Sequence, residues 1–327
     1  MCKANILLIR RNVNARALQK LVSDLNEHHN VIETTPIEPS DGVVSTKRKT
    51  KVHKLITLCE QNEIDFCILV CHSGNPVMRD FQKQYTPKHG YYILEHDLFS
   101  EIPEPIVNEQ ALGAFAFTKP HYAWYNNQKY TTFKTKWYKF DSYTQQGKDF
   151  KTAMIVATRS YNPYSEFDYK YLFKHVYLKP RRSYRKETLE NDCIVDYENW
   201  GNTQALFDLG GKCGFWFTYS SSAFVEALML KCIPIFWKNK FKKVKRINSV
   251  LDTIYVTARG FTKSGRNILA ILADEKLSGK IQLLRASPTL RQEVISMMSE
   301  QWIYKTELPS VSEVLLKDIK TKIGGTK

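Results

Sequence analysis

The sequence predicts an α/β protein built from two doubly wound domains that face each other across a cleft. Three observations predict this class. The chain has 327 residues, more than the roughly 250 to 300 at which one core stops growing. Apolar runs bounded by polar residues recur along it, and segments with helical spacing separate them. Strands that alternate with helices are typical of parallel sheets covered on both faces.

The first domain is expected to span residues 1–150. Strands are predicted at 4–10, 31–32, 65–71, 91–95 and 112–117, and helices near 17–25 and 52–58. A polar segment at 34–51 is expected to be a loop. Residues 119–151 are rich in Tyr, Trp, Lys and Thr with weak periodicity, and we place the domain boundary at their end.

The second domain is expected to span residues 151–327, where the alternation restarts. Strands are predicted at 152–158, 194–195, 214–219, 233–237 and 253–256. Helices are predicted from helical spacing at 169–173, near 203–209 and at 222–231, and the remainder is expected to be mainly helical. No short sequence repeat is evident.

Composition narrows the class of protein. Hydrophobic residues make up 43% and charged residues 25% of the chain, which excludes disordered and collagen-like proteins. No basic start followed by an apolar run and no stretch of ~18 apolar residues occurs, so we expect a cytoplasmic protein. The seven cysteines lack the paired spacing of a structural zinc site, and most lie in apolar runs. We interpret them as buried thiols in a reducing compartment.

The segment 215–236 carries the strongest functional signal. A strand runs into the hydroxyl-rich turn Ser220, Ser221 and Ser222, and a helix follows. These hydroxyls and the free N–H groups of the helix suit an anion. Glu226 lies one turn into this otherwise apolar helix, where a carboxylate needs a partner such as the hydroxyls of a ribose. The alternative is that the serines only cap the helix and Glu226 is solvated.

The hydroxyl-rich turn, the Glu226-Ala-Leu228 segment and the return Lys231-Cys-Ile-Pro-Ile235 resemble the nucleotide-sugar site of GT-B glycosyltransferases. The resemblance implies two Rossmann-like domains. It implies that Glu226 binds ribose, and that Ser221 and Ser222 face the donor phosphates. Related two-domain epimerases share this motif.

Shorter segments at 91–97, 153–159 and 222–231 occur in the order found in the DNA β-glucosyltransferases of T-even phages. This resemblance implies that Asp97 is the catalytic base and that Arg159 contacts the donor phosphate. His96 is an alternative base beside Asp97. A turn-forming aspartate and a surface arginine are the structural alternatives for Asp97 and Arg159.

Two further groups of polar residues are candidates for contact with the acceptor. His72 and Ser73 follow a predicted strand and are placed near donor or acceptor, or in a plain turn. The net charge is +15, with 48 Lys and Arg against 33 Asp and Glu. Basic clusters lie at 47–51, 179–186 and 238–246, and the second supplies Arg181, Arg182, Arg185 and Lys186 as DNA-binding candidates. Such an excess favours a polyanionic partner.

The leading hypothesis is a glycosyltransferase that moves a sugar from a nucleotide donor, expected to be a UDP-sugar, to a hydroxylated base in DNA. The base would have to be flipped out of the duplex. The rivals are a glycosyltransferase or polyol-phosphate transferase of surface polysaccharide synthesis, and a non-catalytic nucleic-acid-binding protein on the same scaffold. No tightly bound cofactor or metal site is expected, and assistance by a divalent metal stays open. G-x-G-x-x-G and P-loop motifs do not occur.

Overall fold

The computed structural model describes most of the chain and divides it into two compact units. Unit 1 comprises Met1–Ser142 and Tyr304–Lys327, and unit 2 comprises Tyr143–Ile303. The described residues are 3–10, 16–35, 45–70, 76–94, 111–141, 143–156, 170–179, 194–195, 203–218, 223–236, 254–257, 267–273 and 276–324.

Unit 1 is built on a parallel sheet in the order β2-β1-β3-β4-β5-β6. Its strands are β1 Asn5–Ile9, β2 Asn30–Thr34, β3 Phe66–Val70, β4 Gly90–Leu94, β5 Ala111–Ala116 and β6 Thr132–Lys134. Its helices are η2 Arg16–Leu18, α1 Gln19–Asn26, α2 Ser45–Gln61, α3 Pro76–Gln84, α4 Lys119–Asn127, η3 Tyr138–Phe140 and α9 Val311–Gly324.

Alternating side chains of this sheet pack against helices on both faces. One face packs against α2 and α3, which contact each other. That core contains Leu7, Ile9, Val52, Leu55, Cys59, Ile64, Cys67, Leu69, Val77, Met78, Phe81 and Tyr91. On the opposite face Tyr92 donates a hydrogen bond to Asp318 of α9 at 2.6 Å. The strands are therefore buried on both sides, as the continuous apolar runs predict.

Unit 2 is built on a second, mostly parallel sheet in the order β12-β13-β11-β10-β7-β8-β9, and the β12/β13 pair is antiparallel. Its strands are β7 Asp149–Val156, β8 His175–Lys179, β9 Ile194–Val195, β10 Cys213–Thr218, β11 Ile233–Phe236, β12 Ile254–Thr257 and β13 Asn267–Leu272. Its helices are η5 Lys170–Leu172, α5 Thr203–Gly210, α6 Ala223–Met229, α7 Leu277–Ala286 and α8 Pro288–Ser299.

The two parallel sheets confirm the predicted fold class, but the predictions missed helix α3 and strand β8, and three segments differ from their expected structure. Helix α2 begins at Ser45, so the expected loop at 34–51 ends earlier than predicted. Strand β13 lies in the tail that was expected to be mainly helical. The weakly periodic region after residue 119 contains α4, β6 and η3. Charged and aromatic residues obscure the periodicity in the first and third of these segments.

Three of the aromatic residues of this third segment are core residues of unit 1. Tyr125, Trp137 and Tyr138 are at most 2% exposed, and Trp137 stacks on Phe117 with ring centroids 6.2 Å apart. These three rings are therefore unavailable for stacking on nucleic-acid bases.

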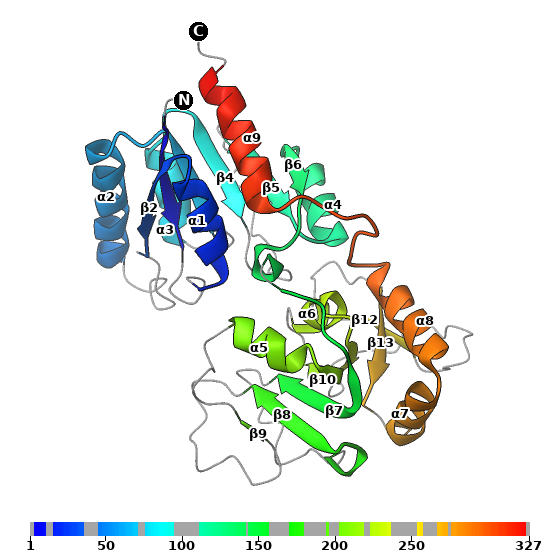
Figure 1. Ribbon diagram of the computed structural model, residues 1–327. Coiled ribbons are helices and arrows are strands. Elements are labelled where there is room, and N and C mark those ends of the chain that lie inside the picture. The colour runs from blue at the N-terminus through cyan, green and yellow to red at the C-terminus, as the bar shows by residue number, and fades with distance from the viewer. Residues whose placement is uncertain are drawn as a thin grey trace. The chain divides into compact units, whose positions relative to one another are not determined.

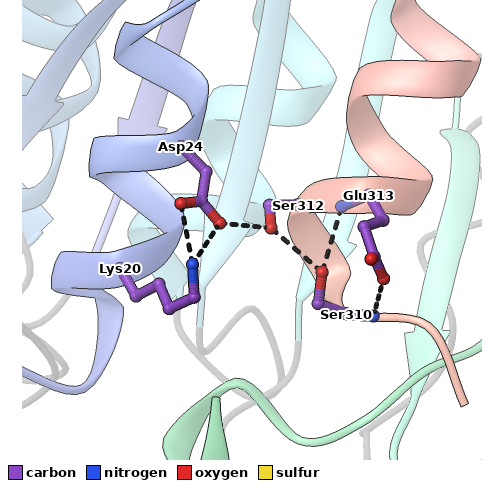
Figure 2. A network of polar contacts seen from close by, with 5 residues as sticks. All are labelled: Lys20, Asp24, Ser310, Ser312 and Glu313. Carbon is purple, nitrogen blue, oxygen red and sulfur yellow. Dashed lines mark hydrogen bonds and ion pairs between the residues drawn. The ribbon is translucent and has the colours of Figure 1, made fainter. Parts of the chain in front are cut away.

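The C-terminal helix α9 returns to unit 1, as Figure 1 shows in red. Its start is a capping box, in which the Glu313 carboxylate accepts from the Ser310 backbone N–H at 2.7 Å and Ser310 Oγ accepts from the Glu313 N–H at 3.2 Å. The network in Figure 2 extends to α1, because Ser312 Oγ donates to Asp24 at 2.6 Å and Lys20 donates to the same carboxylate at 3.0 and 3.1 Å.

This return differs from the single division into 1–150 and 151–327 that the sequence suggested. The chain leaves unit 1 after residue 142 and re-enters it at residue 304. Within unit 1, the segment before the chain leaves and the segment after it returns are hydrogen-bonded to each other, because the Lys136 N–H donates to Pro309 O at 2.9 Å. Burial of Val311, Leu315 and Ile319 on unit 1 explains why the last helix packs there.

The crossing at residue 142 yields a prediction for Asp141. Both of its carboxylate oxygens are buried, and among the described residues neither has a hydrogen-bond partner. Burial raises the pKa of Asp141 to about 6. A raised folded-state pKa means that the ionised form destabilises the fold, so stability falls as pH rises from about 4 to about 6. Asp141→Asn should raise the free energy of unfolding at pH 8 by roughly 1–2 kcal/mol, after allowance for partial solvent screening, with little gain at pH 4.

Urea denaturation of wild type and variant at pH 4, 6 and 8 measures this effect. Glu27→Gln, which removes an exposed carboxylate of unit 1, is the matched control and should show no comparable gain. An equal gain from Asp141→Asn at pH 4 and pH 8 would contradict the proposed cause.

Candidate functional site

The second sheet reverses its strand order between β7 and β10. From β7 the chain proceeds to β8 and β9 on one side, and β10, β11 and β13 lie on the other. In open α/β sheets, ligands bind outside the carboxyl ends of the strands at such a reversal. Here β7 ends at Val156 and β10 at Thr218, and the preceding residues Ile155 and Phe217 are paired.

Glu226 lies on α6, the helix that connects β10 with β11. Its residue is 5% exposed, and the neighbouring residues Ala223, Phe224, Val225, Ala227 and Leu228 are also buried. Phe224 stacks on Phe236 with ring centroids 4.8 Å apart, which fixes the helix on β11. The helix therefore holds a carboxylate inside an apolar layer, and carboxylates are rarely buried to this extent unless they are paired or functional.

The end of α6 is set by a left-handed residue. Lys231 has a φ of 57°, and the Cys232 N–H donates to Ala227 O at 2.8 Å. This turn closes the helix and directs the chain into β11. The resemblance motif Lys231 to Ile235 thus has a local structural role beside its place in the nucleotide-sugar pattern.

Thr218 is a residue of this edge that sequence reasoning missed. It is fully buried, and within the described part of the chain its Oγ1 has no hydrogen-bond partner. A buried hydroxyl without a partner costs about 1–3 kcal/mol. Its position as the last residue of a strand, directly before a hydroxyl-rich turn, was the available signal.

Four cysteines confirm the interpretation as buried thiols. Cys59, Cys67, Cys213 and Cys232 are free and buried. Burial raises the pKa of Cys213 and of Cys232 to about 12. At neutral pH these two are thiols, so neither is a nucleophile. Cys2, Cys71 and Cys193 lie outside the described residues.

The carboxyl edge of the first sheet has a related arrangement. Strands β3 and β4 are adjacent and parallel, and their last residues Val70 and Leu94 are paired. The predicted pair His72 and Ser73 follows β3, and His96 and Asp97 follow β4. The two groups of candidates thus come after neighbouring strand ends of one sheet edge.

Only Glu226 among the predicted site residues lies within the described part of the chain. The others lie outside it: His72, Ser73, His96, Asp97, Arg159, Arg181, Arg182, Arg185, Lys186, Ser220, Ser221 and Ser222. Their assigned roles remain predictions.

Two features are absent from the described residues. No group of three or more His, Cys, Asp and Glu residues there could hold a metal ion. Across the same residues, no helix is both long and apolar enough to span a bilayer.

Comparison with solved structures shows the fold. A UDP-N-acetylglucosamine 2-epimerase from Rickettsia bellii aligns with a TM-score of 0.57 and 11% identity over 99% of this chain and 98% of its own. The Neisseria meningitidis UDP-GlcNAc 2-epimerase, solved bound to UDP-GlcNAc, gives 0.55 and 10% over 97% and 99%. The Streptomyces nogalater glycosyltransferase SnogD gives 0.53 and 10% over 97% and 99%.

These structures have two Rossmann-like domains, and the likeness shows that this chain has the GT-B fold. The structural comparison gives no support to the resemblance to phage DNA glucosyltransferases, and that resemblance stays a prediction. Neither family models nor curated proteins match the sequence.

Gly210, the last residue of α5, contacts Trp216 of β10, one of the two strands at the reversal of strand order. Trp216 Nε1 donates to Gly210 O at 2.8 Å, and a Cβ on Gly210 would collide with the Trp216 ring. Gly210→Ala should therefore lower the free energy of unfolding by about 1–3 kcal/mol through overpacking. Chemical denaturation measures the loss.

Gly279→Ala in α7 is the matched control, because nothing lies within 4 Å of its added Cβ. That substitution should be neutral or stabilising by about 0.5–1 kcal/mol, since alanine is the better helix former. Equal effects from both substitutions would show that the Trp216 contact does not constrain Gly210.

Proposed function

We propose that this protein is a glycosyltransferase that moves a sugar from a nucleotide-sugar donor to a hydroxylated base in DNA. The observation that carries the donor half is the buried carboxylate of Glu226, on the helix that follows the strand reversal of unit 2. The GT-B fold supports the proposal, and one protein of similar structure was solved with UDP-GlcNAc bound. A UDP-sugar is therefore the expected donor.

The donor would be held at the carboxyl edge of the second sheet. Glu226 would accept hydrogen bonds from the ribose hydroxyls. Ser220, Ser221 and Ser222 would donate to the diphosphate, and the Arg159 cation would offset its charge. These residues follow the ends of β10 and β7, which are neighbouring strands. That adjacency is the structural support for a shared site.

The acceptor would be activated at the carboxyl edge of the first sheet. In the proposed step the hydroxyl oxygen of the base bonds to the anomeric carbon while the bond to the diphosphate breaks. The hydroxyl proton passes to Asp97, or to His96 as the alternative base. The electron pair leaves with the nucleoside diphosphate, which Arg159 stabilises. One displacement of this kind inverts the anomeric configuration.

The DNA half of the proposal rests on charge. The chain has a net charge of +15, and Arg181, Arg182, Arg185 and Lys186 would contact phosphates near the flipped base. His72 and Ser73 would lie beside the acceptor hydroxyl. A protein that neutralises several phosphates gains affinity through the release of counterions.

Glu226→Gln tests the donor site directly. Replacing the carboxylate should weaken UDP-sugar binding by roughly 10- to 100-fold, because hydrogen bonds to a charged acceptor contribute about 1.5–3 kcal/mol. Titration calorimetry with UDP and UDP-sugars measures the loss. Glu293→Gln on α8, an exposed carboxylate of the same unit, should bind like wild type. Unchanged affinity in a folded Glu226→Gln protein would disprove this role.

An assay of sugar transfer tests the identity of the acceptor. Purified protein is incubated with a panel of UDP-sugars and duplex DNA that contains hydroxymethylated pyrimidines, and the nucleosides are analysed by mass spectrometry. A sugar mass on the modified base, absent with Asp97→Asn, is the expected result. Donor binding without nucleoside modification would redirect the acceptor to a glycan or lipid, and conversion of the UDP-sugar alone would indicate an epimerase. Absence of nucleotide binding would favour the non-catalytic scaffold.

A further inference from the structure

Helix α2 concentrates positive charge in its first half. Its first ten residues include Lys47, Arg48, Lys49, Lys51 and Lys54 and contain no acidic residue. Lys47, Lys49 and Lys54 are exposed, and so is His53. At 100° per residue, Lys47 and Lys54 lie along one border of the exposed surface, and Lys49 and His53 lie along the other.

This arrangement works against the stability of the helix. Cations near a helix N-terminus oppose the macrodipole, and like charges four residues apart, as in Lys47 and Lys51, repel each other. Arg48 is offset by an ion pair with Asp80 of α3 at 2.8 Å. The exposed lysines oppose the helix dipole and gain no packing in return. Such an arrangement indicates that these residues serve a function.

The topology places the basic half of α2 toward the carboxyl edge of the first sheet. The C-terminal end of α2 lies at the amino edge, because the Asn5 side chain at the start of β1 donates to Asn62 O at 3.0 Å and to Glu63 O at 3.4 Å. The helix runs antiparallel to the strands that it connects, so its N-terminal half lies at the opposite edge. The residues proposed to contact the acceptor follow strands β3 and β4, which end at this edge.

The apolar side of α2 is already occupied by the core of unit 1. Val52, Leu55 and Cys59 are at most 2% exposed, and Ile56 and Leu58 pack against the same cluster. Within the described residues, the large exposed hydrophobics are Tyr171 and Leu283, both in unit 2. A membrane-lying helix inserts its apolar side into the bilayer, and α2 has none to insert.

We infer that the exposed basic residues of α2, Lys47, Lys49, His53 and Lys54, bind the phosphate backbone of duplex DNA. The contact is independent of base sequence. It would hold the duplex beside the carboxyl edge of the first sheet, where the acceptor is proposed to bind. The inference rests on the proposed function for the choice of DNA as the polyanion.

The test compares two triple variants that lose equal charge. Lys47, Lys49 and Lys54 are changed to Gln in one protein. In the control, the exposed Lys151, Lys174 and Lys212 of unit 2 are changed to Gln. Fluorescence anisotropy with an unmodified duplex measures affinity from 50 to 200 mM salt. The α2 variant should bind about 10- to 100-fold more weakly, and its slope of log K against log salt should be smaller by about 2.7, for three lost phosphate contacts.

Two further readouts separate a binding role from a structural one. The Tm of the α2 variant should equal or exceed that of wild type, because charge repulsion is relieved. Its UDP affinity should be unchanged. Equal losses of DNA affinity in both triple variants would overturn the inference, and so would loss of binding to phosphatidylserine vesicles with DNA binding intact.

The inference and the proposed function fail separately. If wild type binds DNA through α2 but no UDP-sugar, the proposed function falls and the DNA surface stands. If it binds UDP-sugars and the α2 variant binds DNA as wild type does, the donor site stands and the DNA surface falls.

Discussion

Parallel strands can be joined only by connections that cross a face of the sheet, and in open α/β sheets the direction of these crossings determines where ligands bind. In unit 2 the crossings run one way from β7 through β9 and the other way from β10 onward. The neighbouring strands β7 and β10 therefore end side by side, while the next strands along the chain, β8 and β11, lie on opposite sides of this pair. The buried residues Thr218 and Glu226 lie on the strand and helix that flank this point.

The return of α9 determines which residues belong to unit 1. Its capping box and its contact with Asp24 fix the first turn (Figure 2), and the bond between Tyr92 and Asp318 anchors the middle of the helix on β4. The hydrogen bond between Lys136 and Pro309 joins the departing and returning segments. Unit 1 is thus assembled from residues at both ends of the chain, and its core requires the C-terminal helix.

Two features lower stability without an evident structural gain. They are the carboxylate of Asp141 with its oxygens buried, and the lysines in the first half of α2. A sequence selected for stability alone would avoid both of them. The lysines lie on a helix to which we assign a ligand, which agrees with the general trade-off between stability and function. For Asp141 the consequence that follows from the structure is a pH-dependent stability.

The sequence by itself determined the fold class and most of the strands, because strands buried on both faces must be apolar throughout and so stand out as runs such as Phe66–Val70 and Cys213–Thr218. It also singled out Glu226, since a charge among consecutive apolar residues is visible without coordinates. The tertiary structure alone decided that Trp137 and Tyr138 are core residues, that α2 presents its lysines to solvent, and that the last helix packs on unit 1. These outcomes depend on contacts between residues far apart in the chain, and local periodicity contains no information about such contacts.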